Sequence, residues 1–85
     1  MANYQVFLSA KAEKELDKLP SQIANQLIDA IKSLGENPRP TGYIKLKGRS
    51  AYRVRSGNYR IIYEIQDRIL LVEVIAIGHR KDIYK

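Results

Sequence analysis

The spacing of apolar residues changes near Ile44 from a helical to a strand-like period, and that change limits the folds the chain can adopt. Before it, Ile23, Leu27 and Ile31 recur at the spacing of one helix face. After it, apolar and polar residues alternate, which is typical of strands with one buried face. A helical first half followed by a strand-rich second half predicts helices packed on one face of a sheet.

Two helices are expected in the first half. Ser9 is a good N-cap for a helix over Lys11–Leu19. Ser21 can cap a second helix, Gln22–Leu34, with Gly35 as its stop signal. The short connection between the two helices predicts an antiparallel helical hairpin.

The second half and the first few residues supply the strands. Gly57-Asn58 and Asp67-Arg68 are turn dipeptides at two-residue hairpin positions. The order β-α-α-β-β-β predicts an α+β fold, with a small antiparallel sheet of about four strands and an N-terminal antiparallel helical hairpin packed on one face. We expect one domain over residues 1–85. The expected strands are Tyr4–Leu8, Ala51–Ser56, Tyr59–Gln66 and Ile69–Ile77, with Lys45–Lys47 as one further short strand.

The first turn decides which side chains share a face of the sheet. A two-residue turn at Gly57-Asn58 pairs Val54 with Ile61 on the face under the helices. Arg55 then lies opposite Arg60 on the other face. Like charges directly opposite each other destabilise a sheet by up to about 1 kcal/mol. An anion bound between the two arginines would offset that cost.

The second turn decides what else comes near this pair. A two-residue turn at Asp67-Arg68 places Arg60 opposite Ile75. Residues beyond Ile77 then emerge beside the Gly57 turn. Distant stretches of the sequence are therefore expected to converge on one cationic cluster, formed by Arg53, Arg55, Arg60, His79 and Arg80, with Tyr84 as a further candidate.

The positive charge of the chain is concentrated in one stretch. The net charge is +6, and the segment from Asn37 to Tyr63 holds seven basic residues and no acidic one. Such a concentration on a structured segment indicates a polyanionic partner, most simply nucleic acid. The alternative is a solvated basic surface that keeps a small protein soluble. The seven residues are Arg39, Lys45, Lys47, Arg49, Arg53, Arg55 and Arg60.

Composition argues against a metal, a cofactor and a membrane. The chain has no cysteine and one histidine, which excludes a cluster of His and Cys metal ligands. It has no glycine-rich phosphate loop or nucleotide fingerprint, so no cofactor is expected. Its longest apolar run is far shorter than the roughly 20 residues that span a bilayer, and its N-terminus lacks a signal pattern. The absence of cysteine suits a reducing cytoplasm, where we expect the protein.

The predicted cluster suits phosphate chemistry. Guanidinium groups bind phosphate bidentately and can stabilise the extra charge of a pentacovalent phosphorane. If the substrate is RNA, its own 2′-OH can attack, so that only a base and an acid are needed. His79 is the candidate for proton transfer, because an unperturbed histidine has a pKa of about 6.5. Tyr84 could donate a proton, position the phosphate or stack on a base.

The residues of this cluster carry a resemblance to a known family. The stretches KLKGRSAYRVRSGNYRIIYEI and VEVIAIGHRKDIY resemble the RelE branch of the RelE/ParE toxin superfamily, and the opening FLSAKAEKELDKLP fits the first helix of that family. The likeness covers nearly the whole chain. It implies a single RelE-like toxin domain over residues 1–85, acting as a metal-independent, ribosome-dependent endoribonuclease that cuts the mRNA codon in the A site by 2′-OH attack.

The resemblance also implies roles for individual residues. Arginine stands at positions 53 and 55, where the best-known family member has lysines, one of them a proposed general base. Arginine stays protonated above a pH of about 12, so Arg55 is a poor base. The base is then His79 or a water. By position, the resemblance implies catalytic roles for Arg53, Arg55, Arg60, Arg80 and Tyr84, to which His79 is added as a candidate.

Partners and alternatives follow from the same resemblance. It implies an acidic, RelB-like antitoxin, the 30S A site of the ribosome and its mRNA. Two other functions stay open: a ParE-like toxin that inhibits DNA gyrase without cutting nucleic acid, and a non-catalytic nucleic-acid-binding domain of the same fold. The residues expected to contact ribosomal or messenger RNA outside the cluster are Lys45, Lys47, Arg49 and Lys81.

Overall fold

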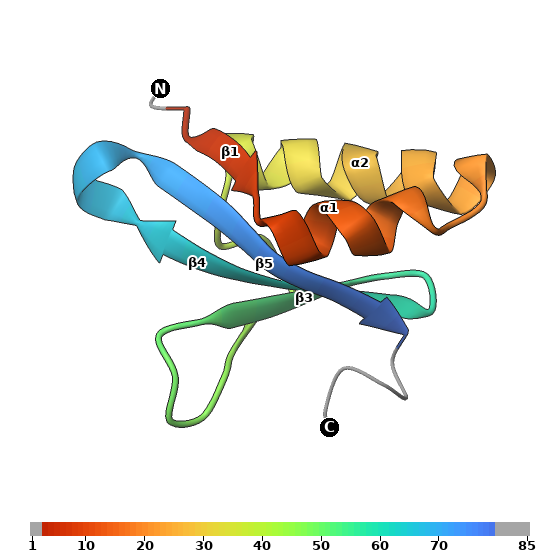
Figure 1. Cartoon of the computed structure of the whole chain (residues 1–85). Helices are drawn as coiled ribbons and strands as arrows, with labels where there is room; N and C mark the ends of the chain where they lie inside the picture. Colours follow the sequence, from red (N-terminus) through yellow and green to blue (C-terminus); the bar gives the residue numbers. More distant parts are fainter. Residues whose placement is uncertain (1–2, 80–85) are drawn as a thin grey trace.

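The predicted order of helices and strands is confirmed. The computed structural model describes residues 3–79, and Figure 1 shows two helices lying over one sheet. This is the expected α+β class, with the order β-α-α-β-β-β and one further short strand. The elements are β1 (Gln5–Leu8), α1 (Ala10–Asp17), α2 (Ser21–Glu36), β2 (Ile44–Lys45), β3 (Tyr52–Ser56), β4 (Tyr59–Gln66), the 3₁₀ turn η1 (Asp67–Ile69) and β5 (Leu71–His79).

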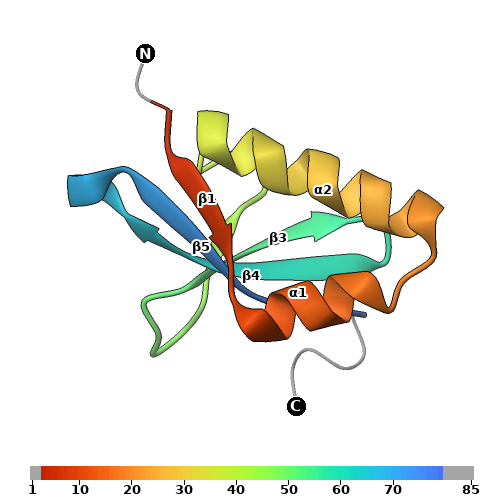
Figure 2. The same cartoon turned by 45° about the horizontal axis from the view of Figure 1, so that its top comes forward.

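The sheet has five strands in the order β1-β5-β4-β3-β2. It is mixed, whereas an antiparallel sheet of about four strands was expected, because β1 runs parallel to β5. Strands that are neighbours along the chain are joined by turns, and turn residues can be recognised in the sequence. β1 pairs instead with β5, at the other end of the described chain, and no turn residue marks a pairing between such distant strands. Figure 2 shows both helices over the same face of the sheet, and within residues 3–79 no helix lies over the other face.

The core lies between the helices and one face of the sheet. The pairing of β3 with β4 is the predicted one, with Val54 opposite Ile61 and Arg55 opposite Arg60. The apolar members of this register face the helices, as the alternation of side chains requires. The buried core residues are Ala12, Leu27, Ile31, Leu34, Val54, Ile61, Tyr63, Val72, Val74 and Ile77.

The helix ends follow the prediction in part. Ser9 caps α1, since its Oγ accepts a hydrogen bond from the backbone N of Ala12 at 3.0 Å. Ser21 is the first residue of α2 and not its cap; Pro20 holds the cap position without a side-chain hydrogen bond. The fixed φ of a proline is compatible with a helix start, but its ring offers no acceptor to the first N–H groups of α2.

Gly35 does not stop α2, which continues to Glu36. Its role is close packing against the start of β1: a Cβ on Gly35 would lie 3.0 Å from the backbone O of Tyr4 and 3.1 Å from Cγ2 of Val6. The backbone N of Tyr4 also donates a hydrogen bond of 2.7 Å to the O of Gly35. The glycine therefore lets the helix touch the strand.

The predicted turn between β4 and β5 is wrong. Asp67-Arg68 is not a two-residue turn but part of a longer connection, in which η1 is followed by Leu70 with a φ of 52°. A β-bulge then shifts the register between Ile62 and Tyr63. Together these features move the partner of Arg60 from Ile75 to Gly78. The longer connection alone accounts for two of these three residues, and a shift of two keeps every side chain on its face, so the hydrophobic pattern could not reveal it.

The helices are short. Over residues 3–79, neither helix has the length and apolar character needed to cross a membrane.

Candidate nucleic-acid interface

Three of the predicted arginines share the sheet face that the helices leave uncovered. Arg53 and Arg55 lie on β3 and Arg60 lies on β4, with Arg55 and Arg60 directly opposite each other. Side chains alternate along a strand, so these arginines point away from the core residues Val54 and Ile61. The predicted convergence of the three arginines is confirmed by this register.

The arginines differ in exposure. Arg55 is exposed, Arg53 is half-buried and Arg60 has an exposed fraction of only 7%. Gly78 of β5 lies opposite Arg60 and has no side chain to cover it. A cavity of about 20 Å³, the size of one water, lies at the hairpin between Arg55 and Arg60. A buried guanidinium beside an exposed one is an arrangement that favours a bound anion.

His79 does not share the face of these arginines. It pairs with Tyr59, and the two rings meet edge to face with centroids 5.5 Å apart. Tyr59 packs against the core under the helices, so His79 lies on the helix side of the sheet. The expected grouping of His79 with Arg55 and Arg60 is therefore wrong. The physical reason is the bulge, because one extra residue in β5 reverses the alternation of every residue after it.

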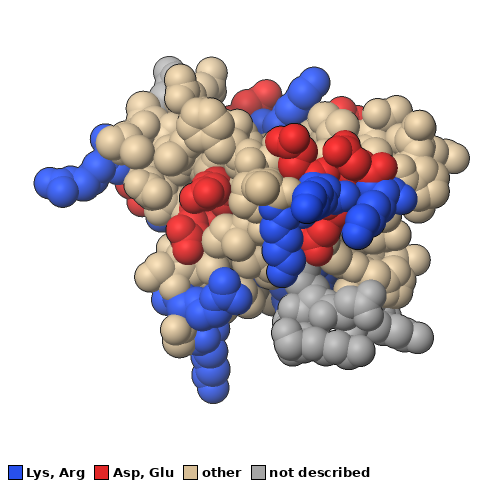
Figure 3. Space-filling view, in the orientation of Figure 1, with Lys and Arg blue, Asp and Glu red and all other residues tan. Residues whose placement is uncertain are grey.

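The other predicted residues fall into two groups. Lys45, Lys47 and Arg49 are exposed on and beside the loop that joins β2 to β3. In Figure 3, blue side chains gather on this loop at the lower left, where it projects from the sheet. Over α1, by contrast, basic and acidic side chains intermingle. Arg80, Lys81 and Tyr84 lie outside the described residues.

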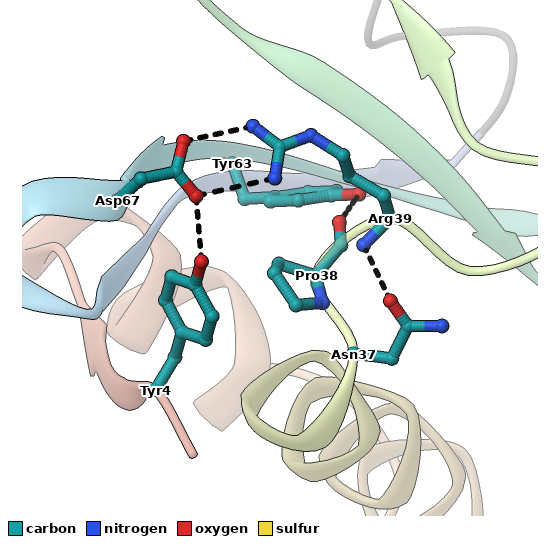
Figure 4. A network of polar contacts seen from close by, with 6 residues as sticks. All are labelled: Tyr4, Asn37, Pro38, Arg39, Tyr63 and Asp67. Atoms are coloured by element: carbon teal, nitrogen blue, oxygen red, sulfur yellow. Dashed lines mark hydrogen bonds and ion pairs between the residues drawn. The ribbon is translucent and has the colours of Figure 1, made fainter. Parts of the chain in front are cut away.

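Arg39, the first of the seven basic residues, is held in an ion pair. Its two terminal nitrogens donate to the two carboxylate oxygens of Asp67 at 3.2 and 2.9 Å. Tyr4 donates a hydrogen bond of 2.6 Å to the same carboxylate, as Figure 4 shows. Sequence reasoning missed this network because its members are far apart along the chain. Because Asp67 neutralises Arg39, six of the seven predicted basic residues remain as candidates for binding a polyanion.

This network raises the pKa of Arg39, chiefly through its hydrogen bonds to Asp67, and shifts those of its two partners. The hydrogen bonds from Arg39, and then from Tyr4, lower the pKa of the Asp67 carboxyl to about 2. The hydrogen bond to the same carboxylate, and then burial, raise the pKa of the Tyr4 hydroxyl. Nearby, burial raises the pKa of Tyr63 to about 12, and its hydroxyl donates a hydrogen bond of 2.7 Å to the O of Pro38 (Figure 4). These contacts fix the loop after α2 to the sheet.

That loop forms one wall of a groove that the sequence did not predict. The groove has a volume of about 580 Å³ and lies between the second half of α2 and the outer side of β3. β2 pairs with β3 only at Tyr52 and Arg53, so the outer edge of β3 continues beyond it. The lining includes apolar groups of Leu34, Ile44 and Val54, with Arg53 and Arg55 at the strand.

Within residues 3–79, no group of three His, Cys, Asp or Glu side chains is placed to hold a metal ion. On the face turned away from the helices, Arg53, Arg55 and Arg60 lie together on β3 and β4, while Glu64 and Glu73 face each other farther along β4 and β5. What this arrangement can do chemically is bind and stabilise negative charge on phosphate.

Comparison with known proteins agrees with the fold. Residues 6–84 match the family described as ParE toxin of type II toxin–antitoxin system, parDE. The chain belongs to this toxin family. Within it, the chain is 30% identical to toxin RelG of Mycobacterium tuberculosis, over 96% of this chain and 97% of that toxin. It is 33% identical to the mRNA interferase toxin RelE of Escherichia coli K12, over 92% and 84% of the two chains.

A solved structure gives the same assignment. The toxin–antitoxin complex RelBE2 from Mycobacterium tuberculosis contains a chain that superposes with a TM-score of 0.82, at 26% identity and with 96% and 97% of the two chains covered. This protein is therefore a RelE-like toxin of the RelE/ParE superfamily, as the sequence resemblance implied.

Proposed function

We propose that this toxin is a ribosome-dependent mRNA endoribonuclease that cuts the A-site codon through attack by the 2′-OH of the RNA and needs no metal. The observation that carries the proposal is the pairing of Arg55 with Arg60 on the uncovered face, opposite Gly78. Two guanidinium groups side by side stabilise the added negative charge of the phosphorane. The similarity to a relative named mRNA interferase supports it.

The residues of the site have distinct roles in this proposal. Arg55 and Arg60 bind the scissile phosphate, while Arg53 orients the neighbouring sugar or phosphate. His79 lies on the other face of the sheet beside Tyr59, so a water on the arginine face is the better acceptor for the 2′-OH proton. Arg80 and Tyr84 keep the roles implied by the family resemblance, charge stabilisation and support of the leaving oxygen.

The partners of the proposal are RNA and an antitoxin. Lys45, Lys47, Arg49 and Lys81 would contact ribosomal RNA. A toxin that acts on the ribosome would work in the cytoplasm. An acidic RelB-like antitoxin is proposed because a similar chain is found in a toxin–antitoxin complex. The groove beside β3 offers apolar surface for part of it, next to Arg53 and Arg55. Residues 1–85 act as one toxin domain in this proposal.

Mapping of cleavage sites in a reconstituted translation system tests the proposal. We expect cuts within the A-site codon on ribosomes and none on the naked message. Arg60→Ala should lower the single-turnover rate by about 100-fold, the usual cost of removing a group that stabilises transition-state charge. Arg68→Ala is the matched control, since Arg68 is an exposed arginine on η1, away from Arg55 and Arg60. Equal rates for the two variants would contradict the site.

A second function is favoured by one finding, the match to the family named for ParE. A ParE-like toxin of this fold would inhibit DNA gyrase and cut no RNA. A DNA supercoiling assay with the purified toxin separates the two. Inhibition of supercoiling without any cut in the message would replace the nuclease proposal, and the absence of both activities would leave a nucleic-acid-binding domain.

A further inference from the structure

The alternation of side chains between the two faces of β5 reverses at one residue, and the start of α1 contacts the strand there. Tyr63 pairs with Val74 and Ile62 pairs with Ala76, so Ile75 is the extra residue of the bulge. β1 accompanies β5 only as far as Val74. Beyond it, the outer edge of β5 lies along α1 (Figure 2). The last part of the strand is therefore held by a helix and not by another strand.

Two polar side chains make this attachment. Ser9, at the start of α1, donates from Oγ to the backbone O of Ile75 at 2.7 Å. Glu15, two turns further along the helix, accepts a hydrogen bond of 2.8 Å at Oε1 from the backbone N of Ile77. A strand that lost this acceptor would leave a backbone N–H beside a helix with nothing from β1 to receive it. The two contacts lie on either side of Ala76 and hold the bulge in place.

The bulge decides which residues reach the arginine face. With it, Gly78 lies opposite Arg60 and His79 lies opposite Tyr59. Without it, residues after Val74 would move to the opposite face, since a slip of one residue inverts a strand. His79 would then come to the face of Arg60, and Gly78 would no longer lie opposite that arginine. Bulges beside functional sites commonly aim side chains in this way.

We propose that Glu15 is a positioning residue of this toxin: by accepting a hydrogen bond from the Ile77 N–H, it holds the β5 bulge in the register that places Gly78, which has no side chain, opposite Arg60 and keeps His79 on the helix side of the sheet. Its effect on cleavage rests on the proposed nuclease function. Its effect on the strand does not. Ser9 also holds the bulge, through its hydrogen bond to Ile75, but it caps α1 as well. A change at Glu15 therefore tests the bulge without removing the helix cap.

The experiment compares Glu15→Ala, Glu15→Gln and Glu13→Ala in the full chain. Glutamine keeps an acceptor oxygen at the same reach and should behave as the wild type. Glu13 is exposed on the same helix and serves as the control. By NMR, Glu15→Ala should speed amide exchange at Ile77 by about tenfold or more, as expected of a locally opened hydrogen bond. It should also weaken the nuclear Overhauser contact between the Tyr59 and His79 rings.

The functional arm is single-turnover cleavage on saturating ribosomes. Glu15→Ala should lower the rate constant by about tenfold, within the range that small misplacement costs, while ribosome affinity stays within about twofold because the basic loop is untouched. Glu15→Asp, one methylene shorter, gives the same test in an acidic variant if the alanine variant does not fold. Recovery of the rate in Glu15→Gln separates positioning from a general loss of stability.

Each result decides the inference. Slow exchange at Ile77 and an intact Tyr59–His79 contact in Glu15→Ala would overturn it, whatever the cleavage rate. A disrupted contact with an unchanged rate would show that the strand phase does not serve the reaction, and would overturn the positioning role. If the wild type cuts nothing, the nuclease proposal fails, and the exchange and ring-contact measurements alone decide whether Glu15 sets the phase of β5.

Discussion

Asp67 illustrates how a single residue can act on stability far from the arginines of β3 and β4. It receives hydrogen bonds from Arg39 and Tyr4, so it joins the loop after α2, the start of β1 and the turn between β4 and β5. Its side chain is about half exposed, and an exposed ion pair contributes modestly. Its value lies in fixing three segments that the chain brings together only on folding.

The pH dependence of stability should report this contact. The pKa of Asp67 falls from an ordinary value of 3.8 to about 2 on folding. The stabilisation is therefore complete above pH 4 or so and is lost as the pH falls through about 2. We expect Asp67→Asn to unfold at lower urea concentration than the wild type at pH 6, with the difference shrinking toward pH 2. For Asp29→Asn, at an exposed site on α2, the difference from the wild type in the urea concentration of unfolding should not shrink in this way.

Arg55 should trade stability for function. It faces Arg60 across the β3–β4 pair, and relief of a like-charge pair is worth up to about 1 kcal/mol. We expect Arg55→Gln to raise the free energy of unfolding by about 0.5 kcal/mol in low salt and to lower the cleavage rate. The gain should fade as salt screens the pair. Arg68→Gln removes the same charge elsewhere. An equal gain in that variant would mean that net charge, not the Arg55–Arg60 pair, is responsible.

At the scale of elements, the sequence predicted what local spacing controls. The helices, β4 and the register of β3 with β4 follow from alternation and turn chemistry. Two features could not be predicted in this way: the parallel pairing of β1, and the four-residue connection between β4 and β5. Neither feature changes which side chains are buried. The bulge at Ile75 does change the faces of the residues after it, but it lies in the continuous apolar run Val74–Ile77, which fits either face, so it too could not be predicted; it moved His79 out of the predicted cluster. The placement of the three arginines depended on the first hairpin alone and was therefore predictable.

Gly35 gives a test of how an element is packed. In an exposed helix, replacing glycine by alanine gains about 1 kcal/mol of helix propensity. Here the new methyl would press on the backbone O of Tyr4, which the neighbouring hydrogen bond keeps in place. We expect Gly35→Ala to destabilise the chain by about 1–2 kcal/mol, the usual cost of overpacking, in urea unfolding. Asn25→Ala, at an exposed position of α2, should be neutral or slightly stabilising; stabilisation at both positions would contradict the packing argument.

At the scale of the whole molecule, charge is divided between two places on the sheet side. The arginines of β3 and β4 form the proposed reaction face, and the exposed loop with Lys45, Lys47 and Arg49 projects from the sheet (Figure 3). The mRNA codon is too short to occupy both. We therefore assign the loop to ribosomal RNA, where salt-dependent contacts with phosphates set affinity and carry no chemistry.

The double variant Lys45→Glu/Lys47→Glu tests this division. It should weaken ribosome binding by tenfold or more, in line with about two lost phosphate contacts, and should reduce the slope of affinity against salt. The single-turnover rate on saturated ribosomes should change by less than about threefold, because the arginine face is intact. Lys11→Glu/Lys14→Glu changes the charge equally on α1, where acidic side chains are interleaved. If both double variants lose affinity alike, net charge steers binding; a fall in rate at full occupancy for the loop variant alone would place Lys45 and Lys47 in the chemistry.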